Sequence, residues 1–153
     1  MTDKSNEKLI LKSNNWNDLK TKIISFNKTK QGEIFEDFSE YLIKTNPLFY
    51  NYSIKNIWNF RYREIPINVL NYLNLAPEDE GIDLIVETKD QKYLAIQCKF
   101  HGNDNYSLSR NDLATCLDTT FNIGKNIEGL YIKTMDPWGI KANKKVSEYY
   151  SRF

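Results

Sequence analysis

Three polar residues lie in two neighbouring segments that otherwise have the composition of buried β-strands. Asp83 lies near the start of the segment GIDLIVET, and Gln97 and Lys99 are two residues apart in the segment YLAIQCKF. Successive side chains of a strand point to opposite faces, so Gln97 and Lys99 share one face. A carboxylate, an amide and an ammonium at adjoining positions of a sheet destabilise the fold unless something compensates them. The pattern therefore indicates a functional site.

The length of the turn between the two segments decides whether Asp83 points to the same face. A two-residue turn would oppose Asp83 to Ile96, on the other face. A three-residue turn, residues 89–91, pairs Asp83 with Gln97, and Cβ atoms of such a pair are roughly 4.5–5.5 Å apart. We predict the three-residue turn. It also gathers the alternate apolar side chains on the opposite face: Leu84, Val86, Leu94, Ile96 and Cys98.

These residue types suit a divalent cation and phosphate chemistry. Asp83 offers an anionic oxygen, Gln97 offers its amide oxygen, and the backbone carbonyl of Cys98 is within reach. Mg²⁺ prefers oxygen ligands at about 2.0–2.1 Å. The Lys99 ammonium can orient an attacking water, or help to deprotonate it, and offset charge on a phosphate. The segment pair therefore predicts a Mg²⁺ site, with Mn²⁺ able to substitute, that needs no histidine.

The composition excludes several other classes of site and partner. The chain has one histidine and two cysteines, which excludes a His-rich metal site, a cysteine zinc site and most Ser-His-Asp chemistry. Lys and Arg number 21 against 20 Asp and Glu, so neither a polybasic DNA binder nor an acidic tail is expected. No apolar run approaches the roughly 18 residues of a membrane span, and the first residues lack a signal-peptide core. We expect a cytoplasmic protein that does not enter a membrane.

The order of the predicted elements indicates how the site is positioned. Asn15 is a candidate N-cap of the first helix, and Ser109 with Asp112 resembles a capping box. We expect an α/β fold, a mixed sheet flanked by helices, in one domain over residues 1–153 with residues 1–14 loosely ordered. The predicted elements are helices over 16–27, 31–45, 67–75, 110–122 and 140–150, strands over 53–60, 82–88, 92–100 and 130–134, and a turn over 136–139.

The sequence resembles a known nuclease superfamily. The G-I-D and I-Q-C-K segments resemble the PD-(D/E)xK superfamily, in particular its Mrr-like branch, where a glutamine replaces the usual acid before x-K. Upstream, GEIFE at residues 32–36 resembles the G-x-x-F-E start of that family's first core helix. Over about residues 30–120 the chain is similar to the N-terminal nuclease domain of type ISP and related helicase-like restriction enzymes. The resemblance implies a restriction-endonuclease-like core, Mg²⁺-dependent cleavage of DNA phosphodiesters and a role in restricting foreign DNA.

The resemblance also implies roles for individual residues. Asp83 matches the metal-binding acid, Gln97 the variant acid position, Lys99 the catalytic lysine and Glu36 the helix glutamate that touches the metal or its water. A neutral amide at position 97 implies a lower metal affinity than a glutamate there.

The position of Glu36 on its helix limits how it can reach the sheet. A helical wheel sets Glu36 nearly opposite the apolar stripe that contains Phe38, so it can reach the sheet only from a second contact edge with Ser39 and Ile43. Glu33, one turn earlier, is the alternative ligand. A plainer interpretation is one solvated acidic face made of Glu33, Glu36, Asp37 and Glu40.

The resemblance implies double-stranded DNA as the substrate, and the net charge bears on the expected partners. A net charge of +1 predicts weak intrinsic affinity for double-stranded DNA. We therefore expect helicase or translocase and methyltransferase domains in a larger protein to deliver the DNA. Two alternatives stay open: a catalytically degenerate binding or assembly module, and a free-standing repair or junction-resolving nuclease. The candidate DNA contacts are His101, Arg110, Lys141, Lys144 and Lys145.

Overall fold

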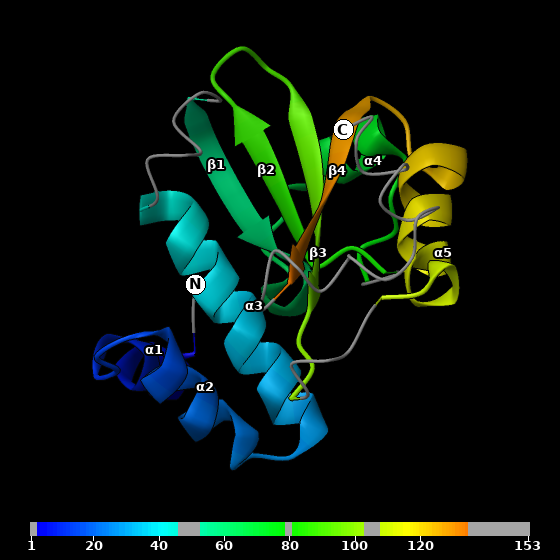
Figure 1. Cartoon of the computed structure of the whole chain (residues 1–153). Helices are drawn as coiled ribbons and strands as arrows, with labels where there is room; N and C mark the ends of the chain where they lie inside the picture. The colour runs from blue at the N-terminus through cyan, green and yellow to red at the C-terminus, as the bar shows by residue number, and fades with distance from the viewer. Residues whose placement is uncertain (1–2, 46–52, 79–80, 103–107, 135–153) are drawn as a thin grey trace.

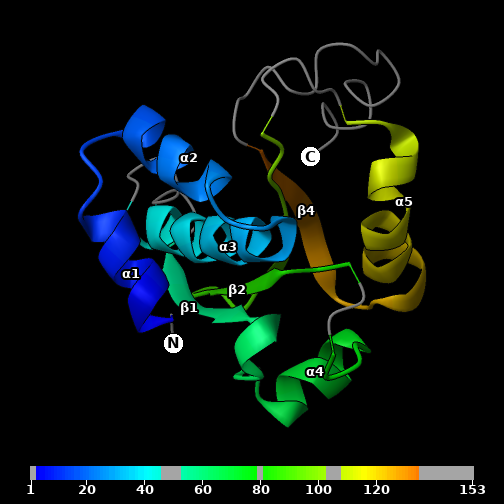
Figure 2. The ribbon, with the colours of Figure 1, turned by 90° about the horizontal axis from the view of Figure 1, so that it is seen from below.

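A four-stranded mixed sheet forms the centre of the computed structural model, which describes residues 3–45, 53–78, 81–102 and 108–134 (Figure 1). The strands are β1 (Ile54–Asn59), β2 (Leu84–Thr88), β3 (Tyr93–Lys99) and β4 (Ile127–Thr134), in that spatial order. β1, β2 and β3 pair antiparallel, whereas β4 pairs parallel to β3. Helices cover both faces of this sheet (Figure 2). The predicted α/β fold with a mixed sheet is confirmed.

The turn between β2 and β3 has the predicted length of three residues. The Thr88 amide donates to the Lys92 carbonyl at 2.9 Å, and Gln91 closes the turn in the left-handed region with φ of 65°. The ladder continues in the same register as far as the pair Leu84 and Ile96. The predicted register, which decides the face of every side chain in the hairpin, is therefore confirmed.

The two faces of the sheet bury different cores. The face covered by α3 (Lys28–Thr45) carries a cluster of Ile43, Leu84, Val86, Leu94 and Ile96, with Cys98 packed against it. On the other face, Ile85 and Ala95 pack with residues of α4 (Ile67–Leu73) and α5 (Arg110–Asp118). Both faces are thus buried, which leaves the ends of the strands as the places where polar side chains can gather.

The helices largely follow their predicted start signals. The side chain of Asn15 accepts from the Asp18 amide at the start of α2 (Trp16–Ile24), and Ser109 and Asp112 form the capping box of α5. α3 (Lys28–Thr45) and β4 each begin three residues before their predicted starts. A short 3-10 helix, η2 (Phe60–Tyr62), follows β1, and a π-helical turn, η3 (Thr119–Ile123), follows α5. The predicted turn over 136–139 and helix over 140–150 lie outside the described residues.

The expectation of loose order at the N-terminus is wrong for the residues that the structure describes. Residues Lys4–Leu11 form helix α1, and Asp3 caps it by accepting from the Ser5 amide. The buried Asn6 amide donates to the Asp37 carboxylate at 2.7 Å, and Ile10 packs against α2 and α3. The polar composition of the segment concealed these contacts, because both depend on α3. Within the described ranges, no helix has the length and apolar character that a membrane span requires.

We predict that Asn6→Ala destabilises the protein by about 1–3 kcal/mol, because it removes a donor from a fully buried carboxylate. Asn17→Ala, at an exposed position of α2, is the matched control and should change the free energy of unfolding by less than about 0.5 kcal/mol. Denaturant unfolding of the full chain measures both values. Equal stabilities of the two variants would show that α1 is not docked through Asn6.

Candidate active site

The backbone ladder between β2 and β3 changes at Asp83, just before β2. In a continued antiparallel ladder, the Cys98 amide would donate to the carbonyl of Ile82. It donates instead to the side chain of Asp83, with Oδ2 at 2.6 Å from the amide nitrogen. The Asp83 backbone is held on both sides, since its amide donates to Ile96 and its carbonyl accepts from Phe60. We call this end of the β2–β3 pair, formed by Asp83, Gln97, Cys98 and Lys99, the fork.

Two polar side chains of the fork are buried. Asp83 is 6% exposed and Gln97 is 7% exposed. The Gln97 amide nitrogen makes a long hydrogen bond of 3.4 Å to the Cys98 carbonyl, and its Oε1 atom has no hydrogen-bond partner among the residues that the structure describes. A buried carbonyl oxygen without a donor costs about 1–3 kcal/mol. The Gln97 oxygen and the Asp83 carboxylate are therefore the groups of the fork with the chemistry to hold a hard cation.

Lys99 lies on the side of the sheet that faces α5. It is half-buried, and its charge acts on the thiol of Cys116 in α5. Burial raises the pKa of Cys116 to about 11; the Lys99 ammonium opposes this rise, whereas the Asp83 carboxylate adds to it. The charges of Asp83 and Lys99 thus both act on the Cys116 thiol; the prediction that the two residues form one site stays a prediction.

Glu36 lies on the second contact edge of α3. The residues one and two turns later on this edge, Ser39 and Ile43, are buried against the sheet. Glu36 itself is half-buried. Burial raises the pKa of the Cys98 thiol well above its usual range, and the charges of Asp83 and Glu36 both contribute to that rise. The charges of both carboxylates thus act on the Cys98 thiol, that of Glu36 from α3 and that of Asp83 from the start of β2.

Arg61, in η2, fixes the carboxylates of α3. Its guanidinium donates to Glu36 Oε2 at 2.8 Å and to Asp37 Oδ1 at 2.6 Å. Asp37 and Glu40 are 0% and 1% exposed, so the interpretation of one solvated acidic face is wrong for these two residues. Sequence reasoning missed Arg61, because an arginine after a strand carries no local signal of a distant carboxylate.

The alternative ligand and the candidate DNA contacts lie elsewhere or outside the described residues. Glu33 pairs with Lys30 within α3 at 3.6 Å. His101 and Arg110 are exposed, the first two residues after Lys99 and the second at the start of α5. Lys141, Lys144 and Lys145 lie outside the described residues. Across residues 3–45, 53–78, 81–102 and 108–134, no group of three or more His, Cys, Asp or Glu side chains could hold a metal, so Gln97 would have to serve as a ligand.

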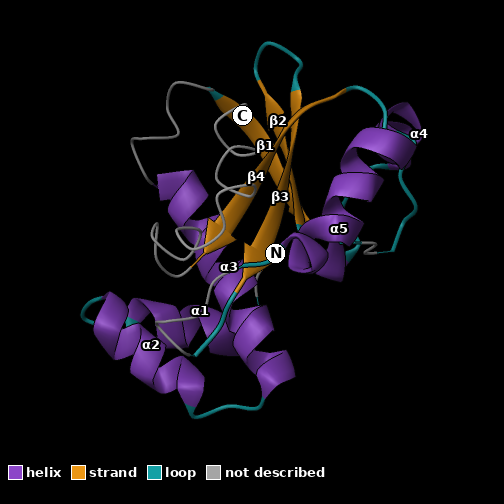
Figure 3. Cartoon of the chain, turned by 45° about the vertical axis from the view of Figure 1, so that its right-hand side comes forward, coloured by secondary structure: helices purple, strands orange, loops and turns teal. Residues whose placement is uncertain are grey.

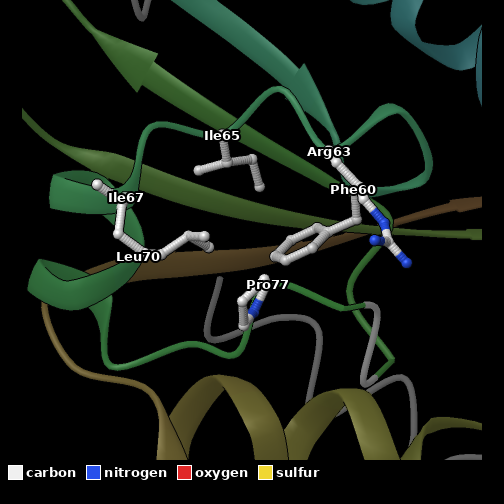
Figure 4. Close-up of a pocket in the computed structure, with 6 residues that line it drawn as sticks. All are labelled: Phe60, Arg63, Ile65, Ile67, Leu70 and Pro77. Atoms are coloured by element: carbon white, nitrogen blue, oxygen red, sulfur yellow. The ribbon is translucent and has the colours of Figure 1, made fainter.

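A small apolar pocket lies between η2, α4 and the segment that follows α4. Its volume is about 160 Å³. Phe60, on one wall, is linked to Asp83 by the backbone hydrogen bond described above (Figure 4). Arg63 is the one charged residue of the lining, so the pocket lacks the convergent polar groups of a catalytic centre. The lining residues are Phe60, Arg63, Ile65, Ile67, Leu70 and Pro77.

The backbone conformation at position 81 explains why the G-I-D segment begins with a glycine. Its φ is 95°, a conformation that side-chain-bearing residues rarely adopt. A Cβ atom at this position would lie 2.9 Å from Thr115 Cγ2 and 3.0 Å from the Cys116 amide nitrogen. The glycine thus lets the chain before β2 lie against α5, and this contact helps to place Asp83.

We expect Gly81→Ala to destabilise the protein by about 1–3 kcal/mol, through backbone strain and the contact with α5. Gly32→Ala is the control, because nothing lies within 4 Å of a Cβ there. In the interior of α3 it should stabilise by about 0.5–1 kcal/mol. Thermal unfolding compares the two variants, and a neutral Gly81→Ala would contradict the role given to this contact.

Comparison with known proteins identifies the family. A family model described as "Restriction endonuclease", Mrr_cat_2, matches residues 44–151. No curated protein and no solved structure matches the chain. The matched range contains the sheet, α5 and the whole fork, and it leaves out Glu36. With most of its length matched, the chain belongs to the Mrr_cat_2 family of restriction endonucleases.

Proposed function

We propose that this chain is the Mg²⁺-dependent DNA endonuclease domain of a restriction system, with the fork as its active site. One observation carries the proposal: the buried Gln97 oxygen, which lacks a donor among the described residues, lies at the same strand end as the Asp83 carboxylate. Membership of a restriction endonuclease family supports phosphodiester hydrolysis as the reaction and DNA as the substrate.

We assign a separate role to each residue of the fork. Asp83, Gln97 and the Cys98 carbonyl would hold Mg²⁺, and Glu36 would add a carboxylate from the α3 face. The ion, when bound, offsets the charge that develops on the phosphate. Lys99 orients the attacking water and stabilises negative charge from the α5 side. The Arg61 guanidinium, 2.8 Å from Glu36 Oε2, would hold this carboxylate in place.

The larger context is also a proposal. With a net charge of +1, the chain has few positive charges in excess for binding a polyanion. This balance supports a domain of a helicase-associated restriction enzyme of the type ISP kind, in which translocase and methyltransferase domains bring double-stranded DNA to the fork. If the protein restricts foreign DNA, we expect it to cleave that DNA in the cytoplasm.

A catalytically degenerate module is the second candidate. The neutral Gln97 favours it, as does the lack of a three-member cluster of His, Cys, Asp or Glu within the described part of the chain. Metal binding distinguishes the candidates, because a degenerate site has no reason to hold a cation at Asp83.

We predict that Asp83→Asn lowers the nicking of supercoiled plasmid by about 100-fold or more, since it removes the charge that holds the ion but keeps a side chain that can accept from Cys98. Glu87→Gln is the matched control: Glu87 is a buried carboxylate at the hairpin end of β2, held by Lys55 and Asn56. Nicking is followed on gels with Mg²⁺ or Mn²⁺. We expect Glu87→Gln to retain activity and Lys99→Met to lose it. Equal nicking by the wild type and the fork variants would trace the activity to a contaminant.

Gln97→Glu should tighten Mn²⁺ binding at least tenfold, because an added charge near 4 Å is worth several kcal/mol even at an effective dielectric constant of about 20. Calorimetric titration measures the affinity. Gln91→Glu, an exposed change at the far end of the hairpin, should leave it unchanged. Asp83→Ala should abolish the heat of binding. A wild type that gives no heat would favour the degenerate module.

A further inference from the structure

Lys133 places an ammonium group beside the fork. On β4 it lies opposite Cys98, and the next residue, Thr134, lies opposite Lys99. Its side chain is half-buried. The ammonium donates to the Thr134 carbonyl at 3.0 Å and lies 5.7 Å from the centre of the Phe35 ring. It forms no ion pair with any residue in the described ranges.

An ammonium in this position is unusual in energetic terms. It has three hydrogens to donate, and one of them meets an acceptor here. Enclosing a charge is costly unless an opposite charge accompanies it. Lys30, another partly enclosed lysine with 26% of its side chain exposed, has the carboxylates of Asp3 and Glu33 for this purpose. Lys133 thus has the hydrogen-bond donors and the positive charge that binding an anion requires.

The neighbours of Lys133 define which side of the fork it serves. It pairs with Cys98 across the β3–β4 ladder and lies over Phe35 of α3, so it points to the α3 face, where its charge also acts on the Cys98 thiol. Lys99 acts on Cys116, across the sheet. The two lysines therefore flank the end of β3 from opposite faces. Arg61 already pairs with Glu36, a carboxylate of α3, and Lys133 forms no ion pair within the described part of the chain.

We propose that Lys133 binds a phosphate group of the DNA backbone on the α3 side of the fork, as a second phosphate-contacting lysine opposite Lys99. The inference rests on the proposed function, because DNA must reach the fork for this contact to form. A phosphate oxygen would satisfy the remaining donors of Lys133 and supply its missing counter-charge. The contact would be to the backbone, so it positions DNA without selecting a sequence.

The test is the salt dependence of DNA binding by the full chain. Fluorescence anisotropy with a labelled duplex, in EDTA to prevent cleavage, gives the affinity over a series of low salt concentrations. We expect Lys133→Met to bind several-fold more weakly and to lower the slope of log affinity against log salt by about 1, the loss of one phosphate contact. Lys55→Met is the matched control, since Lys55 lies on β1 at the hairpin end of the sheet and pairs with Glu87. Its slope should equal that of the wild type.

Thermal unfolding distinguishes this role from a structural one. If Lys133 serves only to cover Phe35 and cap Thr134, Lys133→Met should unfold at a lower temperature and keep the wild-type slope. A phosphate-binding lysine predicts the reverse: an unchanged or higher unfolding temperature, because an apolar side chain replaces an enclosed charge, together with a lower slope. Lys133→Arg should restore the slope.

The outcomes separate this inference from the proposed function. A slope that depends on Lys133, in a chain that cleaves no DNA with Mg²⁺ or Mn²⁺, would support the phosphate contact and overturn the endonuclease proposal. A slope independent of Lys133, in a chain that nicks plasmid through Asp83, would overturn the phosphate contact alone. A wild type that binds no duplex at low salt would overturn both.

Discussion

The hydrogen bond from the Cys98 amide to the Asp83 carboxylate, at 2.6 Å, determines the geometry at this end of the sheet. It takes the place of a backbone hydrogen bond, so β2 and β3 stay connected where their ladder ends. Its position depends on the three-residue turn, which sets the register, and on Gly81, which fits the preceding chain against α5. A shift of one residue in the turn would send Asp83 to the other face and separate it from Gln97. One carboxylate thus closes the sheet and offers the charge of the candidate metal site.

The hairpin and the helix starts could be predicted because their signals are local. The turn at residues 89–91 fixed the faces of β2 and β3, and the side chains of Asn15 and Ser109 cap the helices that follow them. The signals that sequence reasoning missed are long-range. Asn6 and Asp37 are separated by 31 residues and Arg61 and Asp37 by 24, so nothing near α1 or η2 indicated these bonds.

Glu36 shows why a single amphipathic stripe was an incomplete guide to α3. A stripe analysis assumes that one face of a helix is buried and the other is in water. α3 lies between the sheet and the pair of helices α1 and α2 (Figures 2 and 3), so it buries two edges. Ile34 packs with α1 and α2, whereas Ile43 packs on the sheet. Glu36 belongs to the second edge, which the periodicity of one stripe cannot display.

The proposed roles of the fork residues predict that metal binding and DNA binding depend on each other. The carboxylates of Asp83 and Glu36 would repel a phosphate that Lys99 and Lys133 attract. A divalent cation on the carboxylates would remove that repulsion, so the ion should strengthen DNA binding. By thermodynamic linkage, DNA must then strengthen metal binding by the same factor. If the fork holds the ion as proposed, the neutral Gln97 would make the free site a weak metal site, and this coupling would compensate for it, because the ion would be held most tightly when the phosphate is present. Under the proposed function, the near balance of charge over the whole chain and the amide in the fork would then have one explanation: a site that its substrate completes.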